Sequence, residues 1–244
     1  MLPKNLTSSD AAALPAVSLT ALYALKLADF WPLPSKYKNK AVLIHSCAGG
    51  VGSMLVQMAK ILNLHPIVGV VGRTSKVNAA KALGCDIVID KSKQDLWVVA
   101  KSASPKGYAA IFDANGVATL KESYDNLAPT GRLIVYGFHT NLPNTATLNP
   151  FEWLRMAKKM LRMPHFDPMD LTVENKSVLG FNLSFFADER EVLNELFDQV
   201  CDWLNEGKLH TPNVVEMAMS RVCDAHTLIQ SGTSVGKIVL STEE

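Results

Sequence analysis

Residues 41–62, AVLIHSCAGGVGSMLVQMAKIL, limit the possible folds of this chain more than any other stretch. An apolar run ends at His45, a short glycine-rich turn follows from Ser46 to Gly52, and apolar side chains then recur every three or four positions. That period indicates a helix with one buried face, and the run before the turn is typical of a buried strand. The stretch therefore predicts a strand, a tight turn and a helix in direct succession, which is how a βαβ unit begins.

The turn has the chemistry of a phosphate site. Backbone N–H groups at a helix N-terminus have no partner within the helix, and the helix dipole is positive there, so a phosphate can bind without a cationic side chain. Gly49, Gly50 and Gly52 leave room for the turn and for close approach of a pyrophosphate. The spacing is Ser46-x-x-Gly49-x-x-Gly52, with serine where the common dinucleotide motif has its first glycine. Many such turns only pack a helix on a sheet; the flanking strand and helix favour the nucleotide interpretation.

The rest of the chain repeats this alternation of strands and helices. A first helix is expected at residues 8–30, broken into two pieces by Pro15, before a basic connector that contains prolines. Gly84 is expected to end the helix before the third strand. The remaining elements are expected as strands at 66–71, 86–90, 108–114, 131–137 and 177–183, helices at 75–83, 94–104, 117–128, 189–204 and 222–230, and short strands at 211–215 and 236–240.

This order of elements indicates the fold class. Strands and helices alternate at the spacing of right-handed βαβ crossovers, and the strands are almost continuous apolar runs, which indicates a parallel sheet covered by helices on both faces. We predict an α/β fold with a Rossmann-type doubly wound parallel sheet. Past Phe138 the pattern is looser, and we predict a polar loop at residues 139–149 and a basic amphipathic helix at residues 151–162.

Composition argues against several classes of function. A net charge of +1 is unlike a nucleic-acid binder that relies on a broad basic field. We find no apolar run of about 20 residues and no signal pattern, so we expect no transmembrane segment and a cytoplasmic location. Weak contact between the basic helix at 151–162 and an anionic membrane surface stays open. The four cysteines have no C-x-x-C spacing and the six histidines no paired spacing, so no metal site is predicted.

The end of the second strand bears on which nucleotide would bind. A fold that binds NAD usually has Asp or Glu there, which hydrogen-bonds the adenosine ribose. This chain instead has VGRTSK at residues 71–76, without a carboxylate. Arg73 and Lys76 would attract a 2′-phosphate and Ser75 could hydrogen-bond it, so we predict NADPH rather than NADH. The alternative is a solvated basic loop, but cations at a helix N-terminus are unfavourable without an anion nearby.

Several segments together carry a family resemblance. They are AAALPAVSLTALYAL at residues 11–25, VLIHSCAGGVG, VGRTSK, AKALGCDIVID, GRLIVYGF, NKSVLGFNL and VGKIVL. The chain resembles the zinc-independent medium-chain dehydrogenases/reductases, and most of all their branch of quinone oxidoreductases similar to zeta-crystallin and of vesicle amine transport proteins. The resemblance covers nearly the whole chain, and the combination is specific although no single segment is.

The resemblance implies a role for each matching residue. The pyrophosphate would bind at Gly49, Gly50, Val51 and Gly52, in the turn that Ser46 opens. Lys91 stands where the family often has a tyrosine over the 2′-phosphate, and would keep that contact by charge. The other implied contacts are Arg73, Ser75 and Lys76 with the 2′-phosphate, Asn115 with the adenosine side, Gly137 and Phe138 with the nicotinamide ribose, Phe181, Asn182 and Leu183 with the carboxamide, and Thr20 with the nicotinamide.

One departure from the family is large. Its members carry an N-terminal GroES-like catalytic domain of about a hundred residues before the segment that starts here at Ala11. By this comparison, residues 1–35 are a helical segment from the domain junction, residues 36–184 are the Rossmann dinucleotide-binding domain, and residues 185–244 are helices and short strands that normally return to the catalytic domain. We expect either a truncated chain or a protein that has abandoned catalysis.

Two functions remain open. An NADPH-dependent, zinc-independent oxidoreductase would transfer hydride from the nicotinamide to a quinone or an α,β-unsaturated carbonyl, mainly by orienting the two reactants. A non-catalytic module derived from such a reductase would bind NADPH and a partner protein through an apolar surface. The sequence nominates no catalytic residue. Pairing of an edge strand across a homodimer, frequent in the family, is a further expectation.

Overall fold

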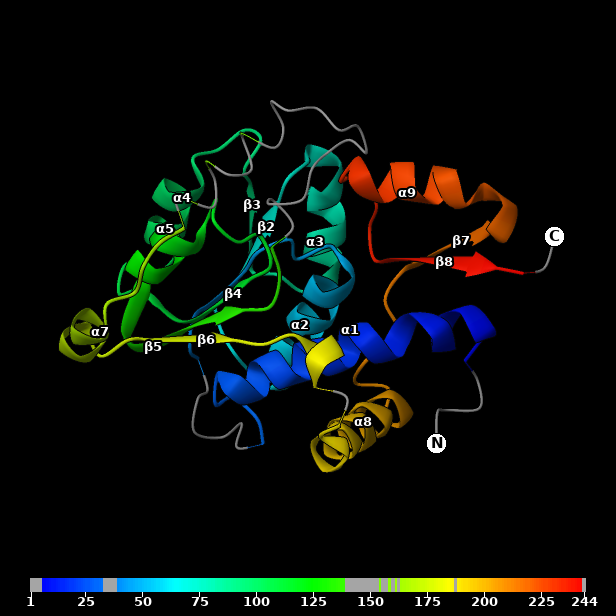
Figure 1. Ribbon diagram of the computed structural model, residues 1–244, viewed down its shortest axis with the longest axis horizontal. Helices are drawn as coiled ribbons and strands as arrows, with labels where there is room; N and C mark the ends of the chain where they lie inside the picture. The colour runs from blue at the N-terminus through cyan, green and yellow to red at the C-terminus, as the bar shows by residue number, and fades with distance from the viewer. Residues whose placement is uncertain are drawn as a thin grey trace.

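The computed structural model describes residues 6–32, 39–138, 163–186 and 188–242, and within residues 151–162 only Leu154, Lys158 and Leu161. These residues form an α/β fold around a six-stranded sheet whose neighbouring strands are all parallel (Figure 1). The strand order is β3-β2-β1-β4-β5-β6, which confirms the predicted doubly wound sheet. The strands are β1 (Val42–Ile44), β2 (Ile67–Val71), β3 (Ile87–Asp90), β4 (Tyr108–Asp113), β5 (Leu127–Val135) and β6 (Ser177–Gly180).

Helices cover both faces of the sheet, and each face has its own hydrophobic core. The helices are α1 (Ser8–Leu27), α2 (Gly50–Ile61), α3 (Val77–Leu83), α4 (Leu96–Ala103), α5 (Leu120–Asp125), α7 (Pro168–Glu174), α8 (Arg190–Asn205) and α9 (Val222–Gln230). One core joins α1, α2, α3 and α8 to strand side chains such as Ile44, and the other joins α4, α5 and α7 to side chains such as Leu43. Successive strand residues point to opposite faces, which is why these neighbours belong to different cores.

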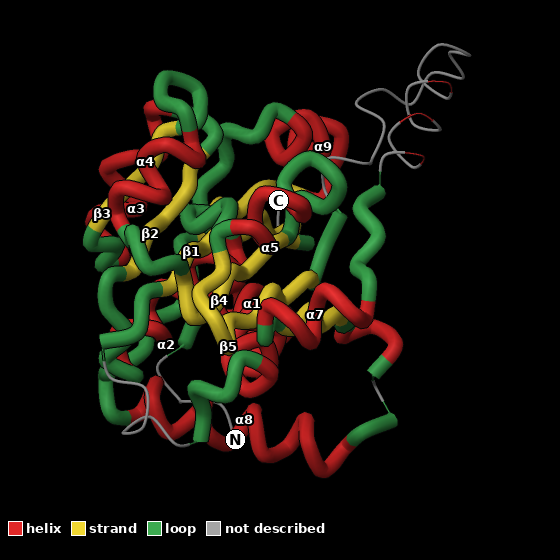
Figure 2. Tube along the Cα trace, turned by 90° about the vertical axis from the view of Figure 1, so that its left-hand side faces the viewer, coloured by secondary structure: helices red, strands yellow, loops and turns green. Residues whose placement is uncertain are grey.

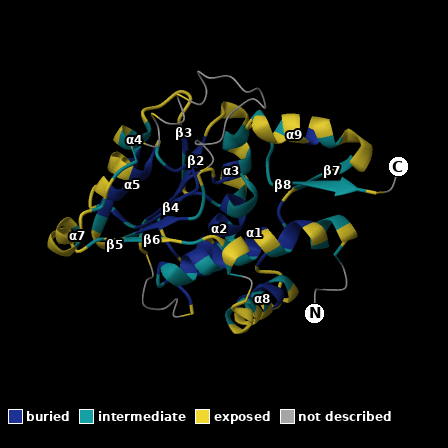
Figure 3. Ribbon diagram, in the orientation of Figure 1, coloured by how far each residue is buried: buried dark blue, intermediate teal, exposed yellow. Residues whose placement is uncertain are grey.

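Burial follows these layers. In Figure 2 the strands form a layer with α5 above it and α2 and α8 below. Figure 3 shows the central strands almost entirely buried, whereas α7 and α9 are exposed along much of their length. A parallel sheet covered on both faces requires strands that are apolar throughout, and β2 is buried at every residue.

The strand order reverses at β1. Val42 of β1 lies opposite Ile67 of β2 on one side and opposite Ala110 of β4 on the other. Because the chain crosses to opposite faces after β1 and after β4, the loops that follow these strands diverge and leave a crevice at the carboxyl edge of the sheet. This crevice is where open parallel sheets bind their ligands.

The prediction that Pro15 breaks the first helix is wrong, because α1 runs without interruption from Ser8 to Leu27. Pro15 has no N–H to donate to the carbonyl of Ala11, which ordinarily weakens a helix at that point. Leu14 and Leu22 on the same helix are fully buried in the core. Their packing therefore outweighs the lost hydrogen bond.

Two other elements differ from those predicted, and a side-chain cap begins the helical turn in each case. β6 ends at Gly180 instead of residue 183, because the Asn182 side chain accepts a hydrogen bond from Ser184 N (3.0 Å) and starts a short 3₁₀ turn. No helix is predicted at α7, although Asp167 caps it and Pro168 occupies its first turn. Aspartate followed by proline is a common helix start, so the signal was present in the sequence.

The C-terminal residues form a second, smaller unit. β7 (Val214–Ala218) and β8 (Lys237–Ser241) pair in parallel, with α9 between them in the chain. β7 starts later than the predicted residue 211, because Pro212 has no N–H for a strand ladder. The unit packs on α1, and Gly236 N donates to the carbonyl of Ala48 (2.9 Å), so it contacts the turn after β1.

The predicted loop at residues 139–149 and the predicted basic helix at residues 151–162 lie outside the described residues, apart from isolated positions in the helix. The suggested contact of that helix with a membrane surface therefore stays a prediction.

One described helix, α1, is long and apolar enough to cross a membrane when judged by length and composition. No such segment is predicted from the sequence. In the fold, 44% of its most apolar window is buried. The core helix of a protein with no membrane span has the same length and composition.

The substitution Pro15→Ala tests this explanation of α1. It restores the N–H that can donate to the Ala11 carbonyl, and it removes the steric conflict of a proline ring inside a helix. Part of the gain is offset, because the unfolded chain becomes more flexible. We expect the free energy of unfolding, measured with urea, to rise by about 1–2 kcal/mol. An unchanged or lower value would contradict the explanation.

Candidate nucleotide site

The turn after β1 places a helix N-terminus at the carboxyl edge of the sheet. Ser46 has a φ of 52°, in the left-handed region, and its carbonyl accepts a hydrogen bond from Gly49 N (2.9 Å). Gly49 caps α2, which starts at Gly50. A Cβ at Gly52 would lie only 2.3 Å from the Ser46 carbonyl oxygen, so only glycine fits there. The first turn of α2, with its unpaired N–H groups, therefore lies directly against the end of β1.

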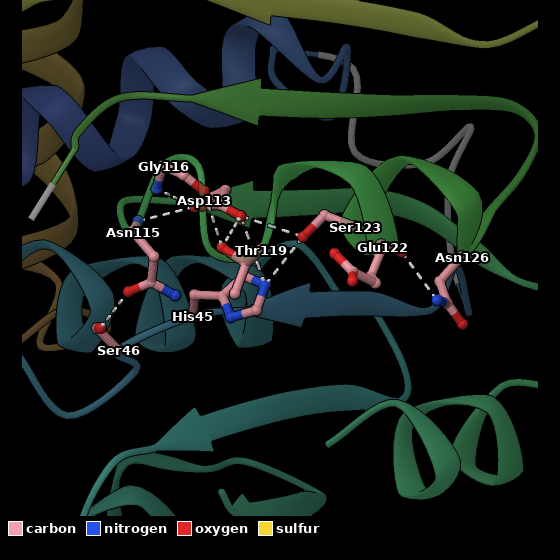
Figure 4. A network of polar contacts seen from close by, with 9 residues as sticks. All are labelled: His45, Ser46, Asp113, Asn115, Gly116, Thr119, Glu122, Ser123 and Asn126. Atoms are coloured by element: carbon pink, nitrogen blue, oxygen red, sulfur yellow. Dashed lines mark hydrogen bonds and ion pairs between the residues drawn. The ribbon is translucent and has the colours of Figure 1, made fainter. Parts of the chain in front are cut away.

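Ser46 also reaches the other side of the crevice. Its hydroxyl donates to Asn115 Oδ1 (3.4 Å) in the loop after β4 (Figure 4). Phe138, which follows β5, packs on Gly116, where a Cβ would lie 2.5 Å from the phenyl ring. Gly137 lies near the backbone of the same loop, since a Cβ there would be 3.1 Å from a carbonyl oxygen just after β4. The ends of β1, β4 and β5 thus bring Ser46, Asn115, Gly137 and Phe138 together.

The three predicted residues after β6 lie at the same edge of the sheet. The Phe181 ring is 4.9 Å from the ring of Tyr23 on α1 and 6.3 Å from that of Tyr136 after β5. Asn182 and Leu183 continue into the short 3₁₀ turn, where the Asn182 side chain is already engaged. Phe181 therefore belongs to a packed aromatic group that links α1 to this end of the sheet.

Thr20 lies on α1 between two residues that contact the sheet edge. Val17, one turn earlier, packs where Gly50 has no side chain, and Tyr23, one turn later, packs at the end of β6. The Thr20 hydroxyl donates to the carbonyl of Ala16 (2.6 Å) in its own helix. Because the Thr20 hydroxyl donates its proton within the helix, only its oxygen is free to accept a hydrogen bond from a ligand. Its predicted position near the nicotinamide stays a prediction.

The basic residues predicted at a 2′-phosphate gather after β2 and β3. Arg73 opens a short 3₁₀ turn that contains exposed Ser75 and half-buried Lys76. Lys91 lies over Gly72, since a Cβ there would be 3.5 Å from Lys91 Cε. Burial lowers the pKa of the Lys76 ammonium below its ordinary value. Arg73, Ser75 and Lys76 thus belong to the loop after β2, and Lys91 packs against this loop.

Two contacts of this loop are not predicted from the sequence. The Arg73 guanidinium donates to the carbonyl of Ser231, which follows α9 (3.2 Å). The Thr74 hydroxyl donates to Asp90 Oδ2 at the end of β3 (2.6 Å). β2 itself ends without a carboxylate, but the neighbouring strand supplies one. Hydrogen bonds from Ser92 and Thr74 lower the pKa of Asp90, so this carboxyl group is ionised at neutral pH.

Asp113, for which the sequence predicts no role, holds the loop after β4 (Figure 4). Its Oδ1 accepts hydrogen bonds from Asn115 N (2.7 Å) and Gly116 N (3.1 Å). Its Oδ2 accepts from Thr119 Oγ1 (2.7 Å) and Ser123 Oγ (3.1 Å). Aspartate bonded to backbone groups two and three positions on is a common turn device, so Asp-x-Asn-Gly at a strand end was the available signal.

His45 completes this buried network. Its Nε2 lies 3.1 Å from Ser123 Oγ and 3.7 Å from Asp113 Oδ2. Its Nδ1 has no hydrogen-bond partner among the described residues. Burial lowers the pKa of the imidazole; the Asp113 carboxylate opposes this shift and the Lys91 ammonium adds to it. His45 is therefore a neutral, only partly satisfied histidine at neutral pH.

Two cavities lie away from these residues. One of about 660 Å³ is lined by α2, α3 and the segment after α8, including Lys60 and Lys208. The other, about 550 Å³, lies at the amino ends of β1, β4 and β5. Neither is lined by a residue predicted to contact the nucleotide, so the candidate site is the open carboxyl edge and not one of these cavities.

Comparison with known proteins identifies the family. The family model for zinc-binding dehydrogenases matches residues 50–198, which is more than half of the chain. The chain belongs to the zinc-binding dehydrogenase family. It is 30% identical over 243 residues to the synaptic vesicle membrane protein VAT-1 homolog of Danio rerio, covering 100% of this chain and 48% of that protein. It is 28% identical over 210 residues to prostaglandin reductase-3 of Mus musculus, covering 83% and 52%.

A solved structure agrees with this assignment. A mycobacterial protein whose structure was solved in complex with NADPH superposes with a TM-score of 0.76 at 25% identity, covering 98% of this chain and 66% of that one. The expected resemblance to vesicle amine transport proteins and to reductases is confirmed. The chain spans about half the length of these two curated relatives.

The family's name raises the question of zinc. Zinc in proteins is held by three or four Cys, His, Asp or Glu side chains at about 2 Å. The described part of the chain contains no group of three such side chains placed to hold a metal ion. The residues present there do not fit zinc, and none of the proposed steps depends on a metal.

The buried state of His45 makes stability depend on pH in a defined direction. Because burial lowers its pKa in the fold, the unfolded chain binds more protons below about pH 6.5. Stability should therefore fall as pH decreases below that value, with a contribution of up to about 1.4 kcal/mol per pH unit from one proton. In His45→Gln this contribution should be lost, and urea unfolding between pH 7 and pH 5 measures it.

The control for this experiment is His226→Gln, which replaces an exposed histidine on α9. This variant leaves the buried network around His45 unchanged, so the pH dependence of its stability should match that of the unaltered protein. If the His45 variant shows the same slope as the unaltered protein, the assignment of a buried, neutral His45 is wrong.

Proposed function

We propose that residues 36–184 are the nucleotide-binding domain of an NADPH-dependent oxidoreductase, flanked by segments that belong with a catalytic domain. The observation that carries this proposal is the close approach of α2 to the end of β1, where the strand order reverses. Open parallel sheets bind ligands at this crevice, and a helix N-terminus there suits a pyrophosphate. Support also comes from relatives: one is named a reductase, and one neighbour was solved with NADPH.

The dinucleotide would extend along the carboxyl edge from β2 to β6. Backbone N–H groups of Gly49, Gly50, Val51 and Gly52 would bind the pyrophosphate, and the missing Cβ at Gly52 allows this turn to form. Ser46 opens this turn, and the proposed contacts on either side are Asn115 at the adenosine half, Gly137 and Phe138 at the nicotinamide ribose, Phe181, Asn182 and Leu183 at the carboxamide, and Thr20 near the nicotinamide.

The charges after β2 and β3 favour the phosphorylated nucleotide. Arg73, Lys76 and Lys91 supply three cations, and Asp90 supplies one carboxylate. That carboxylate already accepts hydrogen bonds from Thr74 and Ser92. These bonds partly offset its negative charge, which weakens its repulsion of a bound phosphate. A phosphate ester carries between one and two negative charges at neutral pH, so the net attraction favours NADPH over NADH.

The proposed chemistry is reduction of a small carbonyl or quinone. Bound NADPH supplies a hydride from its nicotinamide, and the acceptor would be a quinone or an α,β-unsaturated carbonyl. The contribution of this chain would be to hold the nicotinamide in one orientation and to exclude water with its aromatic residues. Tyr136 lies beside Phe181, and burial raises the pKa of its phenol, so it stays protonated and structural.

A second candidate function rests on exposed aromatic side chains near the same edge. Phe185, just after β6, is 91% exposed, and Phe138 is 44% exposed. A partner protein that covered these side chains would remove their apolar surface from water. A non-catalytic NADPH-binding module would use them to bind a partner. β6 is also an edge strand of the sheet, and pairing of two copies through it is a separate proposal that fits either function.

Calorimetric titration with NADPH and with NADH tests the proposal. We expect NADPH to bind at least about tenfold more tightly, a difference of roughly 1.4 kcal/mol. The double variant Arg73→Ala/Lys76→Ala should lose most of that difference while retaining NADH affinity, because only the 2′-phosphate contacts are removed. Equal binding of both nucleotides, or no binding, would overturn the nucleotide assignment.

A matched control removes two cations elsewhere. Lys60→Ala/Lys208→Ala changes the net charge by the same amount at the cavity beside α2, away from the candidate site. Its preference for NADPH should equal that of the unaltered chain. Turnover of a quinone or an enone by the chain would favour the enzyme, and NADPH binding without turnover would favour the module.

A further inference from the structure

A buried hydrogen-bond network lies behind the point where the strand order reverses. It consists of groups from both sides of the crevice. His45 is the last residue before the turn after β1, and Asp113 ends β4. Thr119 and Ser123 come from the start of α5 and from its interior. All four residues are buried, so none of them can contact a nucleotide that lies on the surface of the sheet edge.

We infer that Asp113 is a positioning residue of the proposed nucleotide site, fixing the loop at Asn115 and Gly116 relative to the turn that holds the pyrophosphate. This inference rests on the proposed function. Each Asp113 oxygen accepts two hydrogen bonds, one pair from the loop backbone and one pair from the hydroxyls of Thr119 and Ser123. The carboxylate therefore ties the loop to α5 and uses both of its oxygens to do so.

The hydrogen bonds also determine the protonation state of His45. Ser123 has one hydroxyl proton, which it donates to Asp113 Oδ2. It must then accept from His45, so Nε2 carries the imidazole proton and Nδ1 carries none. Nδ1 lacks a partner among the described residues. The hydrogen bond from Nε2–H to Ser123 orients the Ser123 hydroxyl toward Asp113.

The same groups link the network to the pyrophosphate turn. The residue after His45 is Ser46, whose hydroxyl donates to Asn115 Oδ1. The backbone of Asn115 is in turn fixed by Asp113. Gly116 has a φ of 87°, and the Phe138 ring fills the space beside it, so the loop has little freedom as long as Asp113 holds it. Loss of Asp113 should loosen the loop where Asn115 and Phe138 would contact the dinucleotide.

The test compares affinity with stability in the full chain. Asp113→Ala should bind NADPH about tenfold more weakly, because the loop loses both backbone bonds. Asp113→Asn should recover most of that affinity, since its Oδ1 can still accept from both N–H groups. Ser123→Ala should fall between the two. Affinity is measured by calorimetry, and stability by urea unfolding of the same samples.

Tyr108→Phe is the matched control. Tyr108 lies at the other end of β4, and its buried hydroxyl donates to the carbonyl of Ala100 (2.7 Å). This variant also loses a buried hydrogen bond and should lose stability, but its NADPH affinity should not change. If Tyr108→Phe and Ser123→Ala weaken NADPH binding equally, or if Asp113→Asn binds as poorly as Asp113→Ala, the positioning role is overturned.

A separate readout covers the case in which the proposed function fails. If the unaltered chain binds no NADPH, the nucleotide assignment falls, and with it the purpose given to this loop. Amide hydrogen exchange at Asn115 and Gly116 then decides whether Asp113 fixes the loop at all. Exchange should be faster in Ser123→Ala than in Tyr108→Phe at equal global stability, and equal exchange would overturn the network as well.

Nitrogen NMR of His45 should show the neutral tautomer protonated at Nε2, and the opposite tautomer would contradict the assigned hydrogen bonds.

Discussion

The approach of α2 to the end of β1 is the contact on which the rest of the site depends. A single methyl group at Gly52 would lie 2.3 Å from the Ser46 carbonyl oxygen, so any side chain there would push the helix away from the strand. With glycine at this position, Ser46 adopts a left-handed conformation and its carbonyl accepts a hydrogen bond from Gly49 N. The helix N-terminus then lies at the point where strand order reverses. The backbone, not a charged side chain, supplies the proposed anion site.

Distant parts of the chain stabilise this turn from three directions. Val17 of α1 packs at Gly50, Asn115 after β4 accepts a hydrogen bond from Ser46, and Gly236 before β8 donates to Ala48. The N-terminal helix and the C-terminal strands are therefore not accessory to the sheet, because each contacts the turn directly. This explains why α1 tolerates a proline in its interior: its packing against α2 and the core outweighs one lost helical hydrogen bond.

The sequence predicted the parts of the structure that depend on local order. Apolar runs and the glycine turn indicated the sheet, its crossovers and the residues at the strand ends, and Gly84 ends α3 in the left-handed conformation as expected. The contacts that were not predicted join residues far apart in the chain. The bond from Arg73 to Ser231 reaches the C-terminal unit, and the bond from Thr74 to Asp90 joins neighbouring strands. Asp113 lay within a recognised strand end, yet its carboxylate accepts hydrogen bonds from Thr119 and Ser123, which precede and belong to α5. This helix starts at Leu120 and not at the predicted residue 117.

All of these proposals require that a dinucleotide binds at the carboxyl edge of the sheet, around the turn after β1. Backbone amide spectra of the isotopically labelled chain, recorded while NADPH is added, test this residue by residue. We expect the amides of Gly49, Gly50, Gly52 and Gly116 to shift, while those of Gly107 and Gly131, at the amino edge, stay in place. Shifts confined to the amino edge or to the cavity beside α2 would contradict binding at the carboxyl edge.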